Sequence, residues 1–408
     1  MNHKSRREIL RWVLTAPLSS VPVLMAQSVP SNKQPRIKIT NIESFRIRTT
    51  KNAQGSPDRA DVFQVTRVYT DAGITGTSFL ATPRNVIDSW VKPTLVGEDL
   101  FAIDRHLSRL QMQRGESGVQ SWSGVEHALW DAVGRACNQP VANLLGGYRD
   151  RIRVYRTVTW PGKQDQSDIS FDTITQYAQQ LKTAGYTAMK IRAWRPRPMD
   201  NVEEARYIKK AMGQDFALMY DRTAVRPGWV WDYATGLEVA RGLEQAGAYW
   251  LEEPFDGYDL QGPARLAAEV NIPITGGELG QSMYQFLGYL TNKTYDIVQP
   301  DARICGGLWI ARKVSILAEA FGVRCIQHGT GGPSLAGYIQ AGCAMPNTEF
   351  QEMIGGPQLP ETQWAGAEKL MSSGHVFKVE KGHVLLPEYP GLGLDVNEDA
   401  IKEFRLPE

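Results

Sequence analysis

Hydrophobic and polar residues alternate between Ile37 and Leu80, a period typical of β-strands with one buried face. The alternation breaks at Asp71–Gly73, whose residues favour a tight turn. We therefore predict a small antiparallel meander. Its first connection, Thr49–Ala60, is long and polar, as in loops that close over a binding site.

A helical period follows the meander. Ser123 and Glu126 stand three residues apart at its start, which predicts a capping box, and Pro140 lies beyond its end. The apolar residues that recur on one face of this helix are Val125, Ala128, Leu129, Ala132, Val133 and Ala136. Meander and helices together predict an α+β domain over residues 36–150.

From Tyr155 onward, strand-like and helix-like segments alternate. The predicted strands end near Thr157, Arg192, Asp221, Glu252, Gly277, Gln299, Gln327 and Gln351. An amphipathic stretch such as Ile174–Ala184 lies between successive strands, and several of these stretches finish on a glycine, as helices commonly do. Eight such units favour a (β/α)₈ barrel over residues 151–368. A doubly wound open sheet is the alternative, but no glycine-rich phosphate fingerprint follows the first strand.

The polar tail, residues 369–408, regains short strand-like segments after Val376. We expect this tail to return to the first domain.

The composition of the chain argues against two classes of function. A net charge of +1 with 22% charged residues gives no electrostatic basis for binding nucleic acid. The four cysteines show no CxxC spacing and are most simply buried hydrophobic residues.

The first 26 residues have a different character. Arg6 and Arg7 precede the apolar stretch Trp12–Ala26, which is too short and too interrupted by Pro and Ser to span a membrane. The segment resembles a twin-arginine signal peptide, so we expect a periplasmic or exported protein, with residues 27–35 as a linker. A disordered basic tail is the alternative interpretation.

Polar residues occupy nearly every predicted strand end in the barrel, the edge where barrel enzymes place their active sites. They are Lys190, Arg192, Asp221, Glu252, Glu278, Asp301, His328 and Glu352. Asp221, Glu252 and Glu278 come from three successive strands. Hard oxygen ligands on rigid neighbouring strands suit Mg²⁺, so we predict a magnesium site there.

His328 is the only histidine between Tyr155 and Ala365. A single buried histidine is often a core residue, and that interpretation competes with a catalytic one. Asp301 lies one strand earlier, where it can orient the imidazole and raise its basicity. Together with the adjoining metal site, this favours His328 as a general base.

These residues resemble those of the enolase superfamily, specifically the mandelate racemase/muconate lactonizing enzyme family. The matching motifs are Lys190–Arg192, Asp221, Glu252–Pro254, Glu278, Gln299–Asp301, His328, Glu352, Glu126–Asp131, Gln139–Pro140, Leu144–Gly147 and Pro390–Gly393. The resemblance covers nearly all of the chain after residue 36. It implies an α+β capping domain over a modified (β/α)₈, TIM-like barrel, commonly in a homo-oligomer.

The resemblance also implies a chemistry. Mg²⁺ held by three carboxylates, here Asp221, Glu252 and Glu278, binds a small hydroxy-carboxylate substrate. A base removes the α-proton, and the metal stabilises the resulting enediolate. By position, His328 and Asp301 are the base dyad. Glu352 is an electrophilic partner for the substrate carboxylate.

One position departs from the family pattern. The second strand of the family carries Lys-x-Lys, whereas this chain has Lys190 and Arg192. Arginine stays protonated, so Arg192 is a poor base, although it can still bind a carboxylate, as can Lys190. With one free base, loss of water from an acid sugar fits best. The alternatives are a racemase or epimerase with Lys190 as second base, and a catalytically silent exported binding protein.

Two further groups leave their roles open. Arg195 and Arg197, like Arg192, follow the second barrel strand and favour an anionic substrate, or they form a solvated basic loop. Trp160 and Trp194 have side chains that stack on sugars, or they pack the barrel.

Overall fold

The computed structural model describes residues 36–49, 62–112, 122–158, 169–223, 229–355 and 366–407. The predicted signal peptide and linker, Trp160 and nearly all of the Thr49–Ala60 loop lie outside these ranges. Within them, no helix combines the length and apolar character needed to cross a membrane.

The cap contains the predicted meander. Strands β1 (Ile39–Arg48), β2 (Val62–Thr70) and β3 (Thr75–Ser78) form an antiparallel sheet in that order. Its apolar face packs against α5 (Ser123–Cys137), whose predicted apolar residues are buried except for the half-buried Ala136. Sheet and helix approach closely at Gly76, where a Cβ would lie 2.0 Å from the carbonyl oxygen of Ala128. The remaining cap helices are α2 (Arg84–Val86), η2 (Ile87–Val91), α3 (Lys92–Leu95), α4 (Ile103–Met112) and α6 (Val141–Leu144).

The predicted capping box at Ser123 is wrong. Helix α5 begins at Ser123 itself, its N-cap residue is Trp122, and no side-chain hydrogen bond is found at that cap in the described residues. The carboxylate of Glu126 instead accepts hydrogen bonds from backbone amides of the barrel. The spacing in the sequence suggested that Glu126 bonds the start of its own helix. In the folded chain Glu126 is buried against the barrel and bonds backbone amides there.

The described residues of the barrel contain eight parallel strands. They are β4 (Arg151–Val158), β5 (Ala188–Arg192), β6 (Ala217–Asp221), β7 (Trp250–Glu252), β8 (Ile274–Gly276), β9 (Ile297–Val298), β10 (Arg324–Cys325) and β11 (Phe350–Gly355). They are ordered β11-β4-β5-β6-β7-β8-β9-β10, and a parallel bridge between Thr330 and Met353 joins the segment after β10 to β11. These strands confirm the predicted alternation and rule out an open doubly wound sheet.

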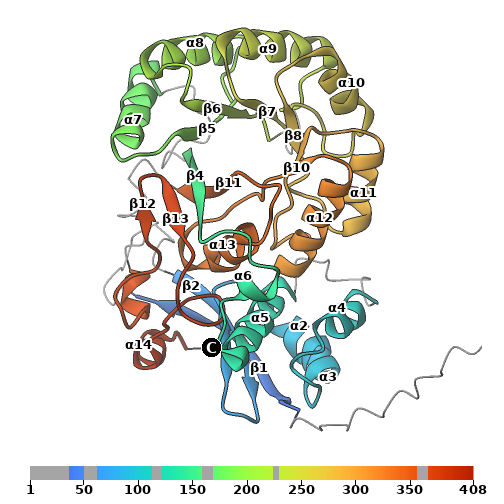
Figure 1. Ribbon diagram of the computed structural model, residues 1–408, viewed down its shortest axis with the longest axis vertical. Helices are drawn as coiled ribbons and strands as arrows, with labels where there is room; N and C mark the ends of the chain where they lie inside the picture. The colour runs from blue at the N-terminus through green and yellow to red at the C-terminus, as the bar shows by residue number, and fades with distance from the viewer. Residues whose placement is uncertain are drawn as a thin grey trace, which may run out of the picture. The chain divides into compact units, whose positions relative to one another are not determined.

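Helices cover the outside of the strands, as Figure 1 shows. They are α7 (Phe171–Thr183), α8 (Asp200–Met212), α9 (Tyr233–Ala246), α10 (Gln261–Glu269), α11 (Met283–Thr291) and α12 (Leu308–Ala320), followed by η4 (Gly332–Leu335) and α13 (Ala336–Cys343). Helix α7 shows how local sequence specifies one of these helices. The Ser170 hydroxyl caps its first turn, and the predicted positions Ile174, Tyr177 and Leu181 are buried.

The C-terminal tail contacts both parts of the chain. Its hairpin is formed by β12 (Val379–Glu380) and β13 (His383–Leu385), and β13 pairs antiparallel with β4. We expected these short strands to return to the cap, but they extend the barrel sheet. After η6 (Glu368–Leu370) and this hairpin, α14 (Glu398–Phe404) does reach the cap. There Glu398 forms an ion pair with Arg67 of β2 at 2.8 Å.

Candidate active site

Below the site, a layer of apolar side chains fills the barrel. Its members come from different strands or their extensions and are Tyr155, Ala188, Met219, Trp250, Ile297, Ile326 and Phe350. The polar residues Lys190, Asp221, Glu252, His328 and Glu352 each follow one of these residues by two positions. Because side chains two apart on a strand share a face, this polar set forms the next inward-facing layer, at the carboxyl ends of the strands.

Lys190 lies at the centre of the predicted carboxylates. Its Nζ is 2.7 Å from Oε1 of Glu252, 2.9 Å from Oε1 of Glu352 and 3.3 Å from Oδ2 of Asp221. The side chain is fully buried. Burial alone would lower its pKa, but the charges of Glu252 and Glu352 outweigh burial and raise the pKa well above its ordinary value. These carboxylates therefore favour the charged form of Lys190.

Arg192 is held on the adjacent side of Asp221. Its Nη1 donates to Oδ2 of Asp221 and, at 2.6 Å, to the hydroxyl of Thr223, while its guanidinium lies 5.4 Å from the ring centre of Trp194. Burial would lower the pKa of Arg192, but Asp221 and Glu278 raise it further above its ordinary value. Arg192 therefore neutralises charge and does not accept a proton.

Thr223 completes this arrangement. Its hydroxyl donates to Oδ1 of Asp221 at 2.5 Å, and its backbone has a φ of +44°. Left-handed backbone is rare for a β-branched residue, and such strain gathers at functional sites. Burial would raise the pKa of Asp221, but the charges of Arg192 and Lys190 lower it, so this carboxylate stays ionised.

Glu252 faces Asp221 across β6 and β7, where the two residues pair in register. Its Oε2 accepts hydrogen bonds from Nε1 of Trp250 at 3.1 Å and from Nε2 of Gln299 at 3.0 Å. Burial, followed by the charge of Asp221, raises the pKa of Glu252 to about 7. Its charge is therefore sensitive to pH near neutrality.

Glu278, the third predicted metal ligand, follows β8 and is positioned by Glu253. Oε1 of Glu253 accepts hydrogen bonds from the backbone N–H groups of Gly277 at 3.1 Å and Glu278 at 3.3 Å. Glu253 itself is buried and has a φ of +44°. This second glutamate thus fixes the backbone that carries Glu278.

The three carboxylates fit a divalent cation by charge, by hardness and by position on successive strands. Oε2 of Glu278 is buried without a hydrogen bond, so a cation would satisfy an oxygen that has none. In the described residues, no three such side chains already converge on one point, because Lys190 and Arg192 form ion pairs with them directly. The donor chemistry therefore fits Mg²⁺, and binding requires these side chains to rearrange.

His328 lies between two carboxylates. Its Nδ1 is 3.0 Å from Oδ2 of Asp301, and its Nε2 is 3.1 Å from Oε2 of Glu278, an ion-pair distance without the alignment of a hydrogen bond. Burial would lower the pKa of His328, but Glu278, Glu352 and Asp301 raise it to about 10. Asp301 thus accepts a hydrogen bond from Nδ1–H of His328 and leaves Nε2 directed at Glu278, one of the predicted metal ligands.

Glu352 ends the polar layer on β11. Its Oε1 accepts a hydrogen bond from Thr157 and its Oε2 accepts one from the backbone N–H of Gly329 at 2.7 Å. Burial would raise its pKa, but Lys190 and His328 lower it well below the ordinary range. Glu352 is therefore an ionised bridge between Lys190 and the segment that carries His328.

Two family models match the chain. Residues 39–146 match the N-terminal domain of the mandelate racemase/muconate lactonizing enzyme family, and residues 173–400 match the enolase C-terminal domain-like model. The chain belongs to this family of the enolase superfamily.

Relatives in the family include sugar-acid enzymes. The chain is 30% identical to the D-galactarolactone cycloisomerase of Agrobacterium fabrum, over 77% of this chain and 82% of that one. It is 28% identical to the D-galactonate dehydratase of Variovorax paradoxus, over 90% and 94% respectively. Its fold matches a crystal structure of D-glucarate dehydratase from Agrobacterium tumefaciens complexed with magnesium, with a TM-score of 0.77 and 27% identity over 91% of this chain and 99% of that one.

The structure thus brings all eight predicted site residues of this family member together at the carboxyl ends of the barrel strands, although only five of them belong to the layer. Other predicted candidates lie elsewhere. Arg195 is buried in an ion pair with Glu204, Arg197 is exposed beside Asp200, and the indole N–H of Trp194 donates to the carbonyl oxygen of Arg222. Sequence reasoning missed several residues that hydrogen-bond the site carboxylates, which are Thr157, Thr223, Gly329 and Tyr338, and it assigned no role to Glu253 of the Glu252–Pro254 motif. The alternation of side chains along the strand could have indicated Thr157, which follows Tyr155 by two positions. The other residues lie on loops or on a helix, where this alternation does not apply.

Proposed function

We propose that the chain is a Mg²⁺-dependent dehydratase that converts an acid sugar to a 2-keto acid. The observation that carries the proposal is the difference in electrostatic surroundings between His328 and the two basic residues of β5, Lys190 and Arg192. Asp301 orients the imidazole of His328, whose Nε2 faces Glu278, a predicted metal ligand, whereas Lys190 and Arg192 are held as cations by carboxylates. A single base removes an α-proton from one face, which suffices for elimination and not for racemisation.

The residues of the chain divide the work. Asp221, Glu252 and Glu278 would hold Mg²⁺, which when bound supplies positive charge to the substrate carboxylate and lowers the pKa of nearby groups. Nε2 of His328 takes the α-proton, and Asp301 stabilises the imidazolium that results. Lys190, Arg192 and Glu352 would bind and orient the substrate carboxylate. The β-hydroxyl then leaves as water with the proton that the His328 imidazolium returns, and the enol that remains tautomerises to the 2-keto acid.

The names of the relatives favour this substrate class. Both the galactonate and the glucarate dehydratase act on polyhydroxylated acids by name. The cycloisomerase relative keeps an isomerase as the second candidate. That candidate needs a second proton acceptor, and Lys190, with three carboxylates within 3.3 Å, is poorly suited to be one.

The test is incubation with Mg²⁺ and a library of aldonic and uronic acids in deuterated water, read for 2-keto products and for deuterium in recovered substrate. A dehydratase forms a keto acid, and its His328→Asn variant forms none and exchanges no α-proton while still binding Mg²⁺. Exchange of both α-epimers without keto acid identifies the isomerase. Absence of any turnover or exchange supports the silent binding protein.

Two properties of the whole protein are part of the proposal. The Arg6–Arg7 pair before an apolar run supports export through the twin-arginine route to the periplasm. Replacing both arginines with Lys should trap the precursor inside the cell, and normal appearance of mature protein outside the cytoplasm rejects this route. By resemblance to the family we propose a homo-oligomer, which light scattering after size-exclusion chromatography tests directly.

A further inference from the structure

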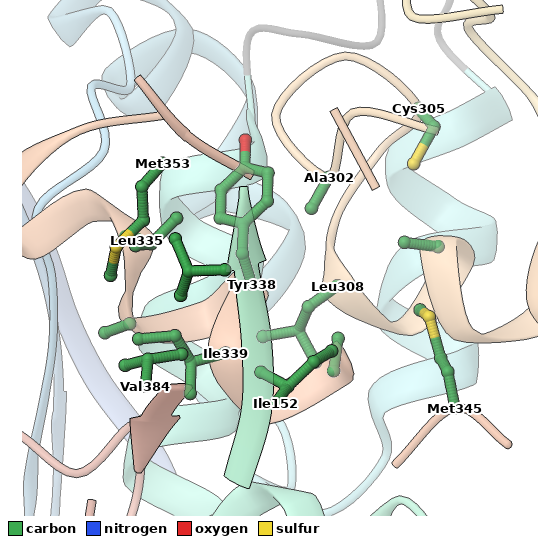
Figure 2. Close-up of a cluster of buried hydrophobic side chains, with 14 of the residues drawn as sticks. Ile152, Ala302, Cys305, Leu308, Leu335, Tyr338, Ile339, Met345, Met353 and Val384 are labelled. Carbon is green, nitrogen blue, oxygen red and sulfur yellow. The ribbon is translucent and has the colours of Figure 1, made fainter. Parts of the chain in front are cut away.

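Tyr338 lies on α13, in the stretch of chain between β10 and β11, and is completely buried. Figure 2 shows its ring standing among apolar side chains, with Leu335 and Met353 on one side and Ala302 and Leu308 on the other. The hydroxyl is at the end of the ring that points out of this cluster. The packing therefore sets the position of the one polar atom of the side chain.

That hydroxyl contacts Asp301. It donates to Oδ1 of Asp301 at 2.5 Å, and it accepts a hydrogen bond from the backbone N–H of Arg303 at 3.1 Å. The same N–H lies 2.7 Å from Oδ1. Burial raises the pKa of Tyr338 well above its ordinary value, so the phenol keeps its proton and must be the donor.

The two oxygens of Asp301 are therefore assigned to different partners. Oδ1 accepts from the Tyr338 hydroxyl and the Arg303 backbone, which leaves Oδ2 for Nδ1 of His328 at 3.0 Å and for the Arg303 side chain at 3.2 Å. A carboxylate bonded at one oxygen in this way cannot rotate freely about its Cβ–Cγ bond. Its other oxygen stays in the plane that meets the imidazole.

A second contact joins Tyr338 to the His328 side of the dyad. Its backbone carbonyl oxygen accepts a hydrogen bond from Nε2 of Gln327 at 2.9 Å, and Gln327 directly precedes His328. One residue of α13 thus contacts the aspartate through its hydroxyl and the neighbour of the histidine through its backbone.

We propose that Tyr338 is a positioning residue that holds Asp301 in the orientation His328 needs to act as a base. The reaction step rests on the proposed function, whereas the hydrogen-bonded chain from Tyr338 to Asp301 to His328 does not. Tyr338 acts through Asp301 and touches no reacting atom.

Tyr338→Phe tests the proposal because it removes the hydroxyl and keeps the ring that packs the cluster. We expect kcat to fall about tenfold with KM within about twofold of the parent, as for other residues that orient a catalytic group. Proton removal should also become more rate-limiting, so the primary isotope effect with α-deuterated substrate should rise. A residue with only a structural role would lower the melting temperature and leave the isotope effect unchanged.

The matched control is Tyr249→Phe. Its hydroxyl also donates to a carboxylate, Oε1 of Glu349 at 2.6 Å, but Tyr249 precedes β7 and so lies at the opposite end of the barrel strands. We expect its kcat and isotope effect to equal those of the parent. Equal losses in the two variants, or an unchanged kcat in Tyr338→Phe, overturn the proposal.

A spectroscopic measurement decides the matter even without a known substrate. The Nδ1 proton of His328, bonded to Asp301, should give a downfield proton resonance that disappears in His328→Asn. In Tyr338→Phe this resonance should shift or broaden, because the carboxylate that fixes it can rotate. A resonance unchanged in position and width overturns the role of Tyr338. If the parent turns over no acid sugar, the proposed function fails, and this measurement still tests Tyr338.

Discussion

The carboxylate of Glu126, on cap helix α5, accepts a hydrogen bond at 2.9 Å from the backbone N–H of Leu308, the first residue of barrel helix α12. Its other oxygen accepts at 3.0 Å from the N–H of Trp309. The acid thus caps a helix of the barrel from the cap, at the positive end of the helix dipole. Gly307 makes room for it, since a Cβ there would lie 2.1 Å from the Glu126 carboxyl carbon.

Replacing Glu126 with Ala should lower the free energy of unfolding by about 3 kcal/mol, since two buried N–H groups lose a charged acceptor. Denaturant titration measures this change. Glu238→Ala, an exposed glutamate on α9, should change stability by no more than about 0.5 kcal/mol. Equal stability of the two variants contradicts a capping role for Glu126.

Glu252→Gln should weaken Mg²⁺ binding about 100-fold or more, because a neutral amide removes one of the three negative charges proposed to hold the cation. Calorimetric titration of parent and variant with Mg²⁺ measures the difference. Glu349→Gln serves as the control, because that carboxylate bonds Tyr249 just before β11, at the opposite end of the barrel strands. Unchanged affinity in Glu252→Gln means that the ligands are assigned incorrectly.

The affinity for Mg²⁺ should depend on pH through Glu252. Its pKa is raised to about 7 by burial and by Asp221, and Mg²⁺ binds the ionised form, so affinity should fall about tenfold per pH unit below about 7 and level off above it.

The raised pKa of Glu252 should also make the stability of the metal-free protein depend on pH. A raised pKa stabilises the fold below the ordinary value of 4.5, and that contribution is lost as pH rises through about 7. Chelator-treated parent should show this loss, and Glu252→Gln should not.

Arg192→Lys should permit slow exchange at the second face of the α-carbon. Arg192 is fixed in its charged form by Asp221 and Thr223. A lysine at this position has a lower intrinsic pKa, and once Mg²⁺ neutralises the carboxylates, the cationic Lys190 beside it lowers that pKa further, so part of it is neutral. Dehydration should fall as the guanidinium contacts disappear. Deuterium incorporation into both α-epimers, compared for parent and variant, measures the gain. Comparable exchange of both epimers by the parent replaces the dehydratase with the isomerase.

Much of the fold could be predicted from the periodicity of hydrophobic and polar residues alone. Period two places Lys190, Asp221, Glu252, His328 and Glu352 above an apolar layer, since the chain must bury alternate side chains inside the barrel. Period 3.6 and terminal glycines located the helices between the strands. The polar residues at the strand ends could then be predicted, because each is found where a run of apolar residues stops.

The sequence by itself therefore determined the barrel, the layer of the site and the types of chemical groups in it, because these depend on local periodicity. The tertiary structure decided the partners. Only folding shows that Glu126 caps a helix of the barrel, that Lys190 is surrounded by carboxylates, and that Tyr338 bonds Asp301. Such contacts join residues that lie far apart in the chain. The packing of whole helices and strands brings them together, so no regular spacing in the sequence indicates the contact.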